Sequence, residues 1–126
     1  QRQVHDAGLA VQECAISQLR PGVLMRDYEL AVEHFMGEKL RELGLLKSIS
    51  HKAVRRFYPH ATSHFLGLNV HDVGEYDRPL EVGAVITVEP GIYIPKEGIG
   101  VRIEDDVLIT HNGIKNLSAK LPRELA

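Results

Sequence analysis

AVITVEPGIYIPKEGIGVRIEDDVLIT, residues 84–110, is the stretch of sequence that decides the fold. Its β-branched and other apolar residues alternate with polar ones, a pattern typical of strands that bury one face. Residues 84–89 predict a strand, and Pro90-Gly91 ends it directly after Glu89, because proline and glycine interrupt regular structure. We therefore expect Glu89 at the end of a strand.

The same stretch continues into a second predicted strand and a hairpin. Residues 100–110 predict the strand, and His111-Asn112-Gly113 after it is a hairpin turn signal. Residues 114–118 are therefore expected to return antiparallel to it. This half of the chain predicts a largely antiparallel sheet.

Two helices are predicted in the first half of the chain. Residues 3–19 carry apolar side chains at intervals of three and four residues, the stripe of an amphipathic helix. A second helix is expected from an N-cap at Asp27 to Leu43, with Gly44 as its C-cap. Residues 45–58 predict a loop or a short irregular helix. Helices followed by strands indicate an α+β fold, with two helices packed on one face of a mostly antiparallel sheet.

The composition indicates one globular domain without a basic surface. The chain has 126 residues, of which 44% are hydrophobic and 25% are charged, so it can bury a sizeable core. A net charge of -2 argues against nucleic acid or an anionic membrane as a partner. No apolar stretch approaches the roughly 20 residues that span a bilayer, so we expect no membrane partner.

Cys14 is the only cysteine, which excludes an internal disulfide and a cysteine-based zinc site. A lone cysteine favours a reducing compartment, and we expect a cytoplasmic protein. Cys14 lies on the apolar stripe of the first predicted helix, where a core role is favoured over a nucleophile. No glycine-rich phosphate loop and no GxSxG motif is present, and Ser63 beside His64 is too close in sequence to define a nucleophile and its base. Nucleophilic catalysis is not expected.

Two glutamates stand within the apolar strand patterns. Because side chains alternate along a strand, Glu89 shares a face with Val85 and Thr87, and Glu104 shares a face with Arg102. A buried ionised glutamate needs an opposite charge, several hydrogen-bond donors or a metal ion. The strands alone leave a second interpretation open, an ion pair between Arg102 and Glu104 on a solvated sheet face.

Three of the seven histidines, His60, His64 and His71, lie close together in the sequence. No HExxH motif is present, which argues against a zincin site. A single histidine is more often a hydrogen-bonded structural residue than a ligand. Combined with two carboxylates, however, a neutral imidazole suits Mn, Fe, Co or Zn, and the predominance of oxygen donors favours Mn.

Three ordered motifs carry a resemblance to a known family. TSHFLGLNVHDVG (62–74), VITVEPGIYI (85–94) and GVRIEDDVLIT (100–110) resemble the C-terminal catalytic half of the aminopeptidase P (Xaa-Pro aminopeptidase) family. Members of that family have the pita-bread fold that is shared with methionine aminopeptidase and prolidase. The helices upstream agree with the same fold, so the resemblance covers nearly the whole chain. The resemblance implies the C-terminal half of a pita-bread fold.

The resemblance also implies a dinuclear metal site. Matched residue by residue, His64 and Glu89 would bind one metal ion, and Glu104 would bridge two ions. The expected cofactors are two divalent ions, with manganese favoured over zinc, cobalt or iron. In addition to binding metal, Glu89 is a candidate catalytic residue that accepts a proton from the attacking water and returns it to the leaving nitrogen.

Four further residues match family positions close to the metals. His60 and His71 match histidines that bind substrate and stabilise the tetrahedral intermediate, so both are candidate catalytic and substrate-binding residues. Arg102 would neutralise or orient charge beside Glu104, and we count it as a catalytic and substrate-binding candidate. Tyr93 would help to shape the substrate site.

The implied activity is release of the N-terminal residue from peptides with proline in second position, with a metal-activated water as nucleophile. Two alternatives stay open: an Xaa-Pro dipeptidase (prolidase), and a non-catalytic pita-bread relative that binds a peptide or protein. The residues preceding Phe65 favour aminopeptidase P over prolidase, and the VHDVG and GVRIEDD contexts argue against methionine aminopeptidase.

The chain departs from the family pattern in one respect. A complete site in the family also uses two aspartates from an earlier hairpin, and no aspartate here stands in that motif. We therefore expect residues 1–126 to be the C-terminal part of a metallopeptidase catalytic domain without its N-terminal half. Such an incomplete site would bind metal weakly, because repulsion between its glutamates is uncompensated, and the chain alone would be inactive. An uncovered apolar edge would favour a homo-oligomer.

Overall fold

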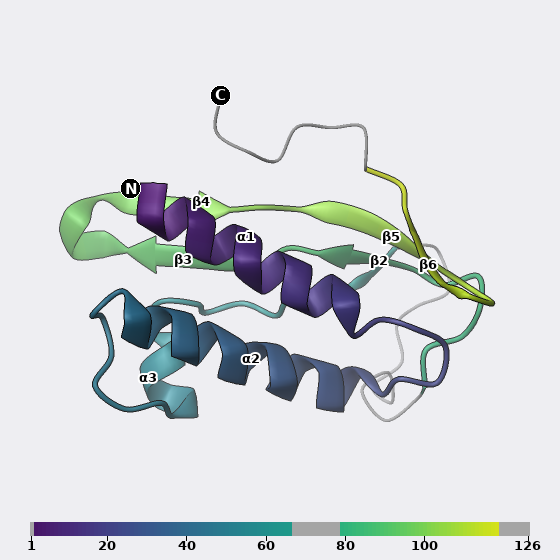
Figure 1. The fold of residues 1–126 in the computed structure, drawn as a ribbon, viewed down its shortest axis with the longest axis horizontal. Helices are drawn as coiled ribbons and strands as arrows, with labels where there is room; N and C mark the ends of the chain where they lie inside the picture. Colours follow the sequence, from purple (N-terminus) through teal and green to yellow (C-terminus); the bar gives the residue numbers. More distant parts are fainter. Residues whose placement is uncertain (1, 67–78, 119–126) are drawn as a thin grey trace.

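The computed structural model describes residues 2–66 and 79–118, and every structural statement below concerns these residues (Figure 1). The helices are α1 (Arg2–Ser17), α2 (Met25–Glu42), α3 (His51–Arg55) and a short 3-10 helix, η2 (Pro95–Glu97). The strands are β1 (Phe65–Leu66), β2 (Val85–Val88), β3 (Gly91–Ile94), β4 (Ile99–Arg102), β5 (Asp105–Thr110) and β6 (Gly113–Asn116).

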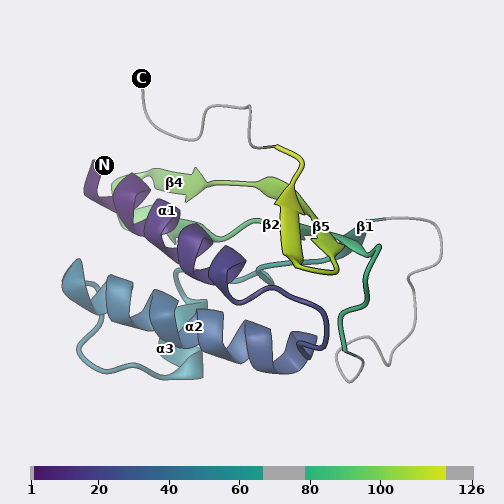
Figure 2. The same ribbon diagram turned by 45° about the vertical axis from the view of Figure 1, so that its right-hand side comes forward.

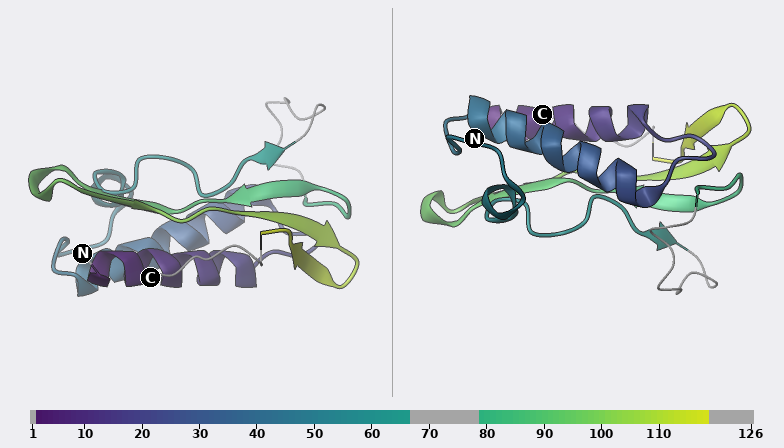
Figure 3. Two further views of the ribbon diagram at one scale, coloured as in Figure 1. Left: turned by 90° about the horizontal axis from the view of Figure 1, so that it is seen from above. Right: turned by 90° about the horizontal axis from the view of Figure 1, so that it is seen from below.

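The strands form two antiparallel sheets that the helices cover. One sheet has the order β1-β2-β5-β6, the other pairs β3 with β4, and every pairing is antiparallel (Figure 2). Figure 3 shows α1 and α2 on one side of the strands, with the teal segment that leads from α3 to β1 on the other. The predicted α+β arrangement, two helices on a mostly antiparallel sheet, is confirmed.

The two sheets share one long hairpin. β2 pairs with β5 so that Val88 lies opposite Asp105, and β3 pairs with β4 so that Gly91 lies opposite Arg102. These two pairings have the same register, so β2 runs into β3 and β4 runs into β5 as two arms that meet at η2. A one-residue slip would turn every side chain of an arm to the other face, so the register determines which residues face the helices.

The hairpin is interrupted at one position in each arm. Pro90 accepts a hydrogen bond from the backbone N–H of Ile103 at 3.2 Å, but it has no N–H to donate in return. The ladder therefore loses one of its paired bonds there. The single strand predicted over residues 100–110 was wrong in this respect: it is divided into β4 and β5 at Ile103 and Glu104 because a proline stands in the opposite arm.

The limits of α2 depart from the sequence prediction at one end. The helix begins at Met25, and its N-cap Leu24 makes no side-chain capping bond. Asp27, the predicted N-cap, lies in the first turn instead, where its negative charge favours the positive end of the helix dipole. At the other end Gly44 has a φ of 82°, and the residue after it donates its N–H to the carbonyl of Leu40 at 2.9 Å. The predicted glycine cap is thus confirmed as a Schellman motif.

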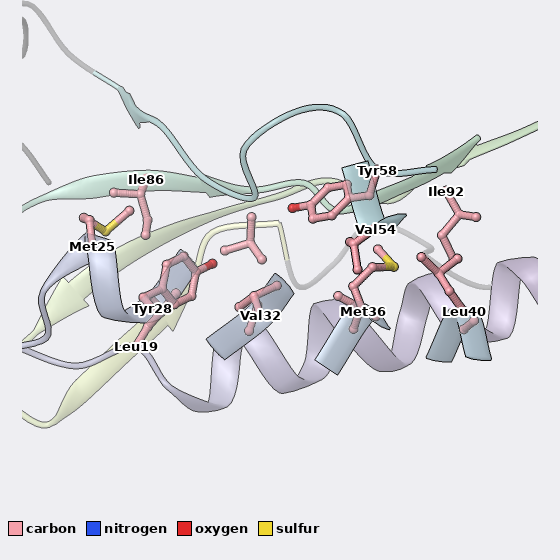
Figure 4. Close-up of a cluster of buried hydrophobic side chains, with 14 of the residues drawn as sticks. Leu19, Met25, Tyr28, Val32, Met36, Leu40, Val54, Tyr58, Ile86 and Ile92 are labelled. Carbon is pink, nitrogen blue, oxygen red and sulfur yellow. The ribbon is translucent and has the colours of Figure 1, made fainter. Parts of the chain in front are cut away.

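A single core joins the helices to the inner face of the hairpin (Figure 4). Its largest fully buried hydrophobic side chains are Val11, Tyr28, Val32, Met36, Leu40, Val54, Tyr58, Ile86, Val88, Ile92 and Ile109. Burying each aliphatic side chain of this size contributes about 1.5–3 kcal/mol. Gly8 of α1 lies against the same face, because a Cβ placed on it would meet the side chain of Ile103 at 3.6 Å. The inner face of the hairpin is therefore the face that packs on the helices.

Two smaller predictions were tested by the structure. The uncertain region 45–58 contains a short helix, α3, whose N-cap Ser50 accepts a hydrogen bond from the N–H of Ala53 at 3.1 Å. Cys14, which was expected in the core, is only half-buried. Of the helices in the described ranges, none is long and apolar enough to cross a membrane.

Candidate metal site

The outer face of the sheet carries the polar residues that the sequence analysis selected. The segment before β1 continues alongside β2, because Thr87 donates its N–H to the carbonyl of His64 at 2.9 Å and Glu89 donates its N–H to that of Thr62 at 2.7 Å. On the other side of β2, the register with β5 continues to place Glu89 opposite Glu104. The segment before β1, the arm that contains β2 and the arm that contains β5 therefore each contribute every second residue to the outer face of the sheet.

His64 and Glu89 form the closest pair on this face. Nδ1 of His64 lies 3.2 Å from Oε2 of Glu89, and it also lies 3.1 Å from Oγ1 of Thr87. The backbone N–H of His64 donates to the same threonine oxygen at 3.0 Å, so Thr87 fixes both the backbone and the ring. The side chain of His64 is 62% exposed whereas that of Glu89 is only 13% exposed. An accessible imidazole thus stands beside a largely buried carboxylate.

One oxygen of Glu89 is chemically unsatisfied. Oε2 is buried, and within the described part of the chain it receives no hydrogen bond. A buried carboxylate oxygen without a hydrogen bond is costly, and the neighbouring imidazole offsets that cost only when it is protonated. A divalent cation bound between this oxygen and an imidazole would remove that cost. The donor types also fit, since carboxylates and imidazole are ligands for Mn, Fe, Co and Zn.

Glu104 stands across the hairpin from Glu89. Pro90 and Ile103 occupy a hydrogen-bonded position of the ladder, so by alternation the neighbouring Glu89–Glu104 position has no mutual backbone hydrogen bonds, and opposite side chains approach most closely there. Like charges in that position repel each other, and a cation between them would offset the repulsion. Across residues 2–66 and 79–118, however, the structure brings no three His, Cys, Asp or Glu side chains together in a group that could hold a metal ion. It pairs His64 with Glu89 and leaves the Glu104 side chain exposed.

His60 and Tyr93 extend the same face beyond the glutamates. Nδ1 of His60 lies 2.9 Å from the carbonyl oxygen of Ala61, which can only accept, so Nδ1 carries the proton in that bond. In the neutral ring Nε2 then accepts from the Tyr93 hydroxyl, 3.1 Å away. Gly91 makes this contact possible, because a Cβ there would lie 2.9 Å from His60 Nε2 and 2.7 Å from Tyr93 Oη.

The remaining candidates are placed less closely. Arg102 lies opposite Gly91 and is exposed. The ion pair with Glu104 that the strands left open does not form among the residues described. His71 lies outside the described residues. On the outer face the structure thus joins His64 to Glu89 and His60 to Tyr93, whereas Arg102 and Glu104 are exposed on the neighbouring arm.

The sequence analysis missed a carboxylate that holds this face from behind. Glu29 of α2 is buried, and its two oxygens accept the backbone N–H groups of Thr62 at 2.9 Å and Ser63 at 3.0 Å. Burial raises the pKa of Glu29, and the two backbone donors act in the opposite direction. The signal was present in the sequence, because Glu29 follows Met25 by four residues and precedes Val32 by three, on the apolar stripe of its helix.

Two tyrosines complete the contacts of this segment. The hydroxyl of Tyr28 lies 2.7 Å from Oγ of Ser63, and the hydroxyl of Tyr58 is hydrogen-bonded to Oγ1 of Thr62. Burial raises the pKa of both tyrosines, so both stay protonated. Ser63, dismissed as a nucleophile, is thus buried and engaged in structure.

A second network holds the backbone on either side of His60. Nη1 of Arg55 donates to the carbonyl of Tyr58 at 3.1 Å and to that of His60 at 2.7 Å. Nε of the same guanidinium donates to Oε1 of Glu33 at 3.1 Å, and Nδ1 of His51 lies 2.7 Å from that oxygen. Arg55 therefore connects α2 to the segment that carries His60.

Comparisons with known proteins agree with this geometry. Residues 1–111 match the model of metallopeptidase family M24. The chain is 43% identical to an Xaa-Pro aminopeptidase of Haemophilus influenzae and 38% identical to Xaa-Pro aminopeptidase 3 of Homo sapiens. These alignments cover 100% and 99% of the chain, but only 33% and 28% of those proteins. The chain spans about a third of the length of the curated relatives it matches.

Solved structures give the same result for the fold. A zinc-substituted aminopeptidase P of Escherichia coli in complex with product aligns with a TM-score of 0.85 at 42% identity, over 97% of this chain and 32% of that one. Aminopeptidase PepP of Pseudomonas aeruginosa aligns with a TM-score of 0.85 at 38% identity, over 96% of this chain and 32% of that one. The predicted fold is confirmed as the α+β part of a pita-bread fold. With the match of residues 1–111, the chain belongs to metallopeptidase family M24.

Proposed function

We propose that this chain is the C-terminal part of the catalytic domain of a dinuclear metal-dependent aminopeptidase, one that releases the N-terminal residue from peptides with proline in second position. The observation that carries the proposal is the buried, unsatisfied Oε2 of Glu89 beside the imidazole of His64. The similarity to Xaa-Pro aminopeptidases supports the substrate class.

The proposed ligands come from the outer face of the sheet. His64 and Glu89 would hold one divalent ion, and Glu104, opposite Glu89 in the register, would bridge two. Three carboxylate or imidazole ligands dominated by oxygen favour manganese over zinc, cobalt or iron. When bound, the two ions would lower the pKa of a water molecule and polarise the scissile carbonyl.

The residues of this chain would then handle protons and orient the peptide. Glu89 would accept a proton from the attacking water and return it to the leaving proline nitrogen. His60, held by its bonds to Ala61 and Tyr93, would bind substrate on the same face. We assign the hydrogen bond to the developing oxyanion to His71, and charge compensation beside Glu104 to Arg102.

Peptide hydrolysis by the complete gene product tests this proposal. We expect release of the first residue from an Xaa-Pro-Yaa tripeptide with added Mn²⁺, and loss of that release on chelation. Cleavage of an Xaa-Pro dipeptide without cleavage of the tripeptide would assign the protein to the prolidases. Absence of both activities, with metal bound, would assign it to the non-catalytic relatives.

A further inference from the structure

We infer that Glu29 is a positioning residue for the metal site: its carboxylate holds the backbone of Thr62 and Ser63 so that His64 stands against Glu89. The inference rests on the proposed function, because it takes His64 and Glu89 to be ligands. It concerns a residue of α2, on the far side of the segment from the outer face. Glu29 itself would touch neither metal nor substrate.

The connection from Glu29 to Glu89 runs through one residue. Thr62 donates its N–H to Oε1 of Glu29 at 2.9 Å, and its carbonyl accepts the N–H of Glu89 at 2.7 Å. Thr62 is therefore bonded to α2 on one side and to the arm that carries Glu89 on the other. The next residue, Ser63, donates its N–H to Oε2 of Glu29 at 3.0 Å. Two successive peptide units are thus fixed to one carboxylate directly before His64.

The segment needs this support because its own strand is short. β1 consists of Phe65–Leu66 alone, and ahead of it the segment is joined to the next arm through the carbonyls of His64 and Thr62. Isolated pairs of this length are marginal without packing against other elements. Hydrogen bonds to a charged acceptor are stronger than those between neutral groups. The carboxylate therefore restrains two successive peptide units before His64 through charge-assisted bonds.

An amide cannot replace the carboxylate at this position. Both oxygens of Glu29 accept from backbone N–H groups, whereas a glutamine has one acceptor oxygen and one NH2 donor. Glu29→Gln would therefore keep the size of the side chain and set a donor against a backbone donor. One of the two N–H groups would lose its partner in a buried position.

The test uses the complete gene product with Glu29→Gln, and Glu13→Gln as the matched control. Glu13→Gln makes the same chemical change at an exposed position of α1. Mn²⁺ affinity is measured by calorimetry, and amide exchange of Thr62 and Ser63 by NMR in the metal-free protein. We expect about tenfold weaker Mn²⁺ binding or more, in the range found for residues that orient metal ligands. We also expect faster exchange at one or both amides, with neither change in the control.

The free energy of unfolding separates positioning from general stability. Unchanged Mn²⁺ affinity with a lower free energy of unfolding would overturn the inference, since Glu29 would then only stabilise the fold. If Glu29→Gln does not fold, Glu29→Asp takes its place, because it keeps both acceptors on a shorter side chain; weaker Mn²⁺ binding would again support the inference and unchanged binding would overturn it. Failure of the proposed function is seen separately, as absence of peptide hydrolysis by the wild-type protein with Mn²⁺ bound.

Discussion

Nδ1 of His64 lies 3.2 Å from Oε2 of Glu89, an oxygen that is buried without a hydrogen bond from the described residues. A carboxylate in that state is a poor structural group and a good metal ligand. A bound cation would offset the free energy lost by burying it. Metal binding and folding stability should therefore be coupled at this pair.

Added Mn²⁺ should raise the free energy of unfolding of the wild-type protein. At a free metal concentration of 100 times Kd the increase is about 2.7 kcal/mol, provided that the unfolded chain does not bind. His64→Ala should remove most of this Mn²⁺-dependent increase, as measured by urea denaturation. His111→Ala, in the exposed turn between β5 and β6, should keep it. Equal metal stabilisation in both variants would show that His64 is not a ligand.

Glu89→Gln should abolish turnover of an Xaa-Pro peptide. Loss of a general acid–base residue typically costs about 10²–10⁴-fold in rate, and loss of a ligand adds to it. Steady-state kinetics measures kcat at saturating Mn²⁺. Glu97→Gln in η2 makes the same change at an exposed position and should retain wild-type kcat. A Glu89→Gln protein with normal kcat would remove Glu89 from the mechanism.

Gly91→Ala should separate the His60–Tyr93 pair. The new Cβ would lie 2.7 Å from Tyr93 Oη and 2.9 Å from Tyr93 Cε2, so the ring must move and its bond to His60 is lost. Overpacking of this kind costs about 1–3 kcal/mol. We expect a lower free energy of unfolding and a higher KM for the peptide. Gly8→Ala, where the added Cβ makes ordinary contacts at 3.6 Å or more inside helix α1, should not lower the free energy of unfolding and should leave KM unchanged.

The stability contribution of Glu29 should decrease as pH rises. Burial raises its pKa in the folded protein above the ordinary value of 4.5, so the folded state holds the proton more tightly than the unfolded chain. The part of its contribution that comes from this pKa shift is therefore fully present below about pH 4.5 and is lost as pH rises through the folded pKa.

Urea unfolding of wild-type and Glu29→Gln proteins between pH 4 and 8 would measure this effect. The difference in unfolding free energy, wild type minus variant, should fall with rising pH. The difference in unfolding free energy between wild type and Glu13→Gln should not change with pH. If the difference between wild type and Glu29→Gln instead grows with pH, the two backbone donors outweigh burial and lower the pKa of Glu29.

Much of the fold was predictable because it depends on local patterns. The apolar stripes of α1 and α2, the β-branched runs and Gly44 each act within a few residues of sequence. The division of residues 100–110 was not predictable in this way, because its cause, Pro90, lies in the opposite arm of the hairpin. An effect that crosses from one strand to its partner leaves no mark on the partner's own sequence.

The candidate site shows the same limit. The alternation of side chains along the strands identified Glu89 and Glu104 from the sequence alone. The register of the hairpin then places the two residues opposite each other. The part played by Glu29 depends on contacts with Thr62 and Ser63, which only tertiary structure brings together. The roles of the site residues, the manganese preference, the cytoplasmic location and the homo-oligomer remain predictions.

The shared register of the long hairpin has a practical consequence for engineering. The arms formed by residues 90–94 and 99–103 match in length between η2 and the two glutamates. An extra residue in one arm would rotate its glutamate to the helix side, whereas extra residues between 95 and 98 would leave both arms in step. A fluorescent or lanthanide-binding tag can therefore be inserted at this tip without changing the register that sets the two glutamates opposite each other.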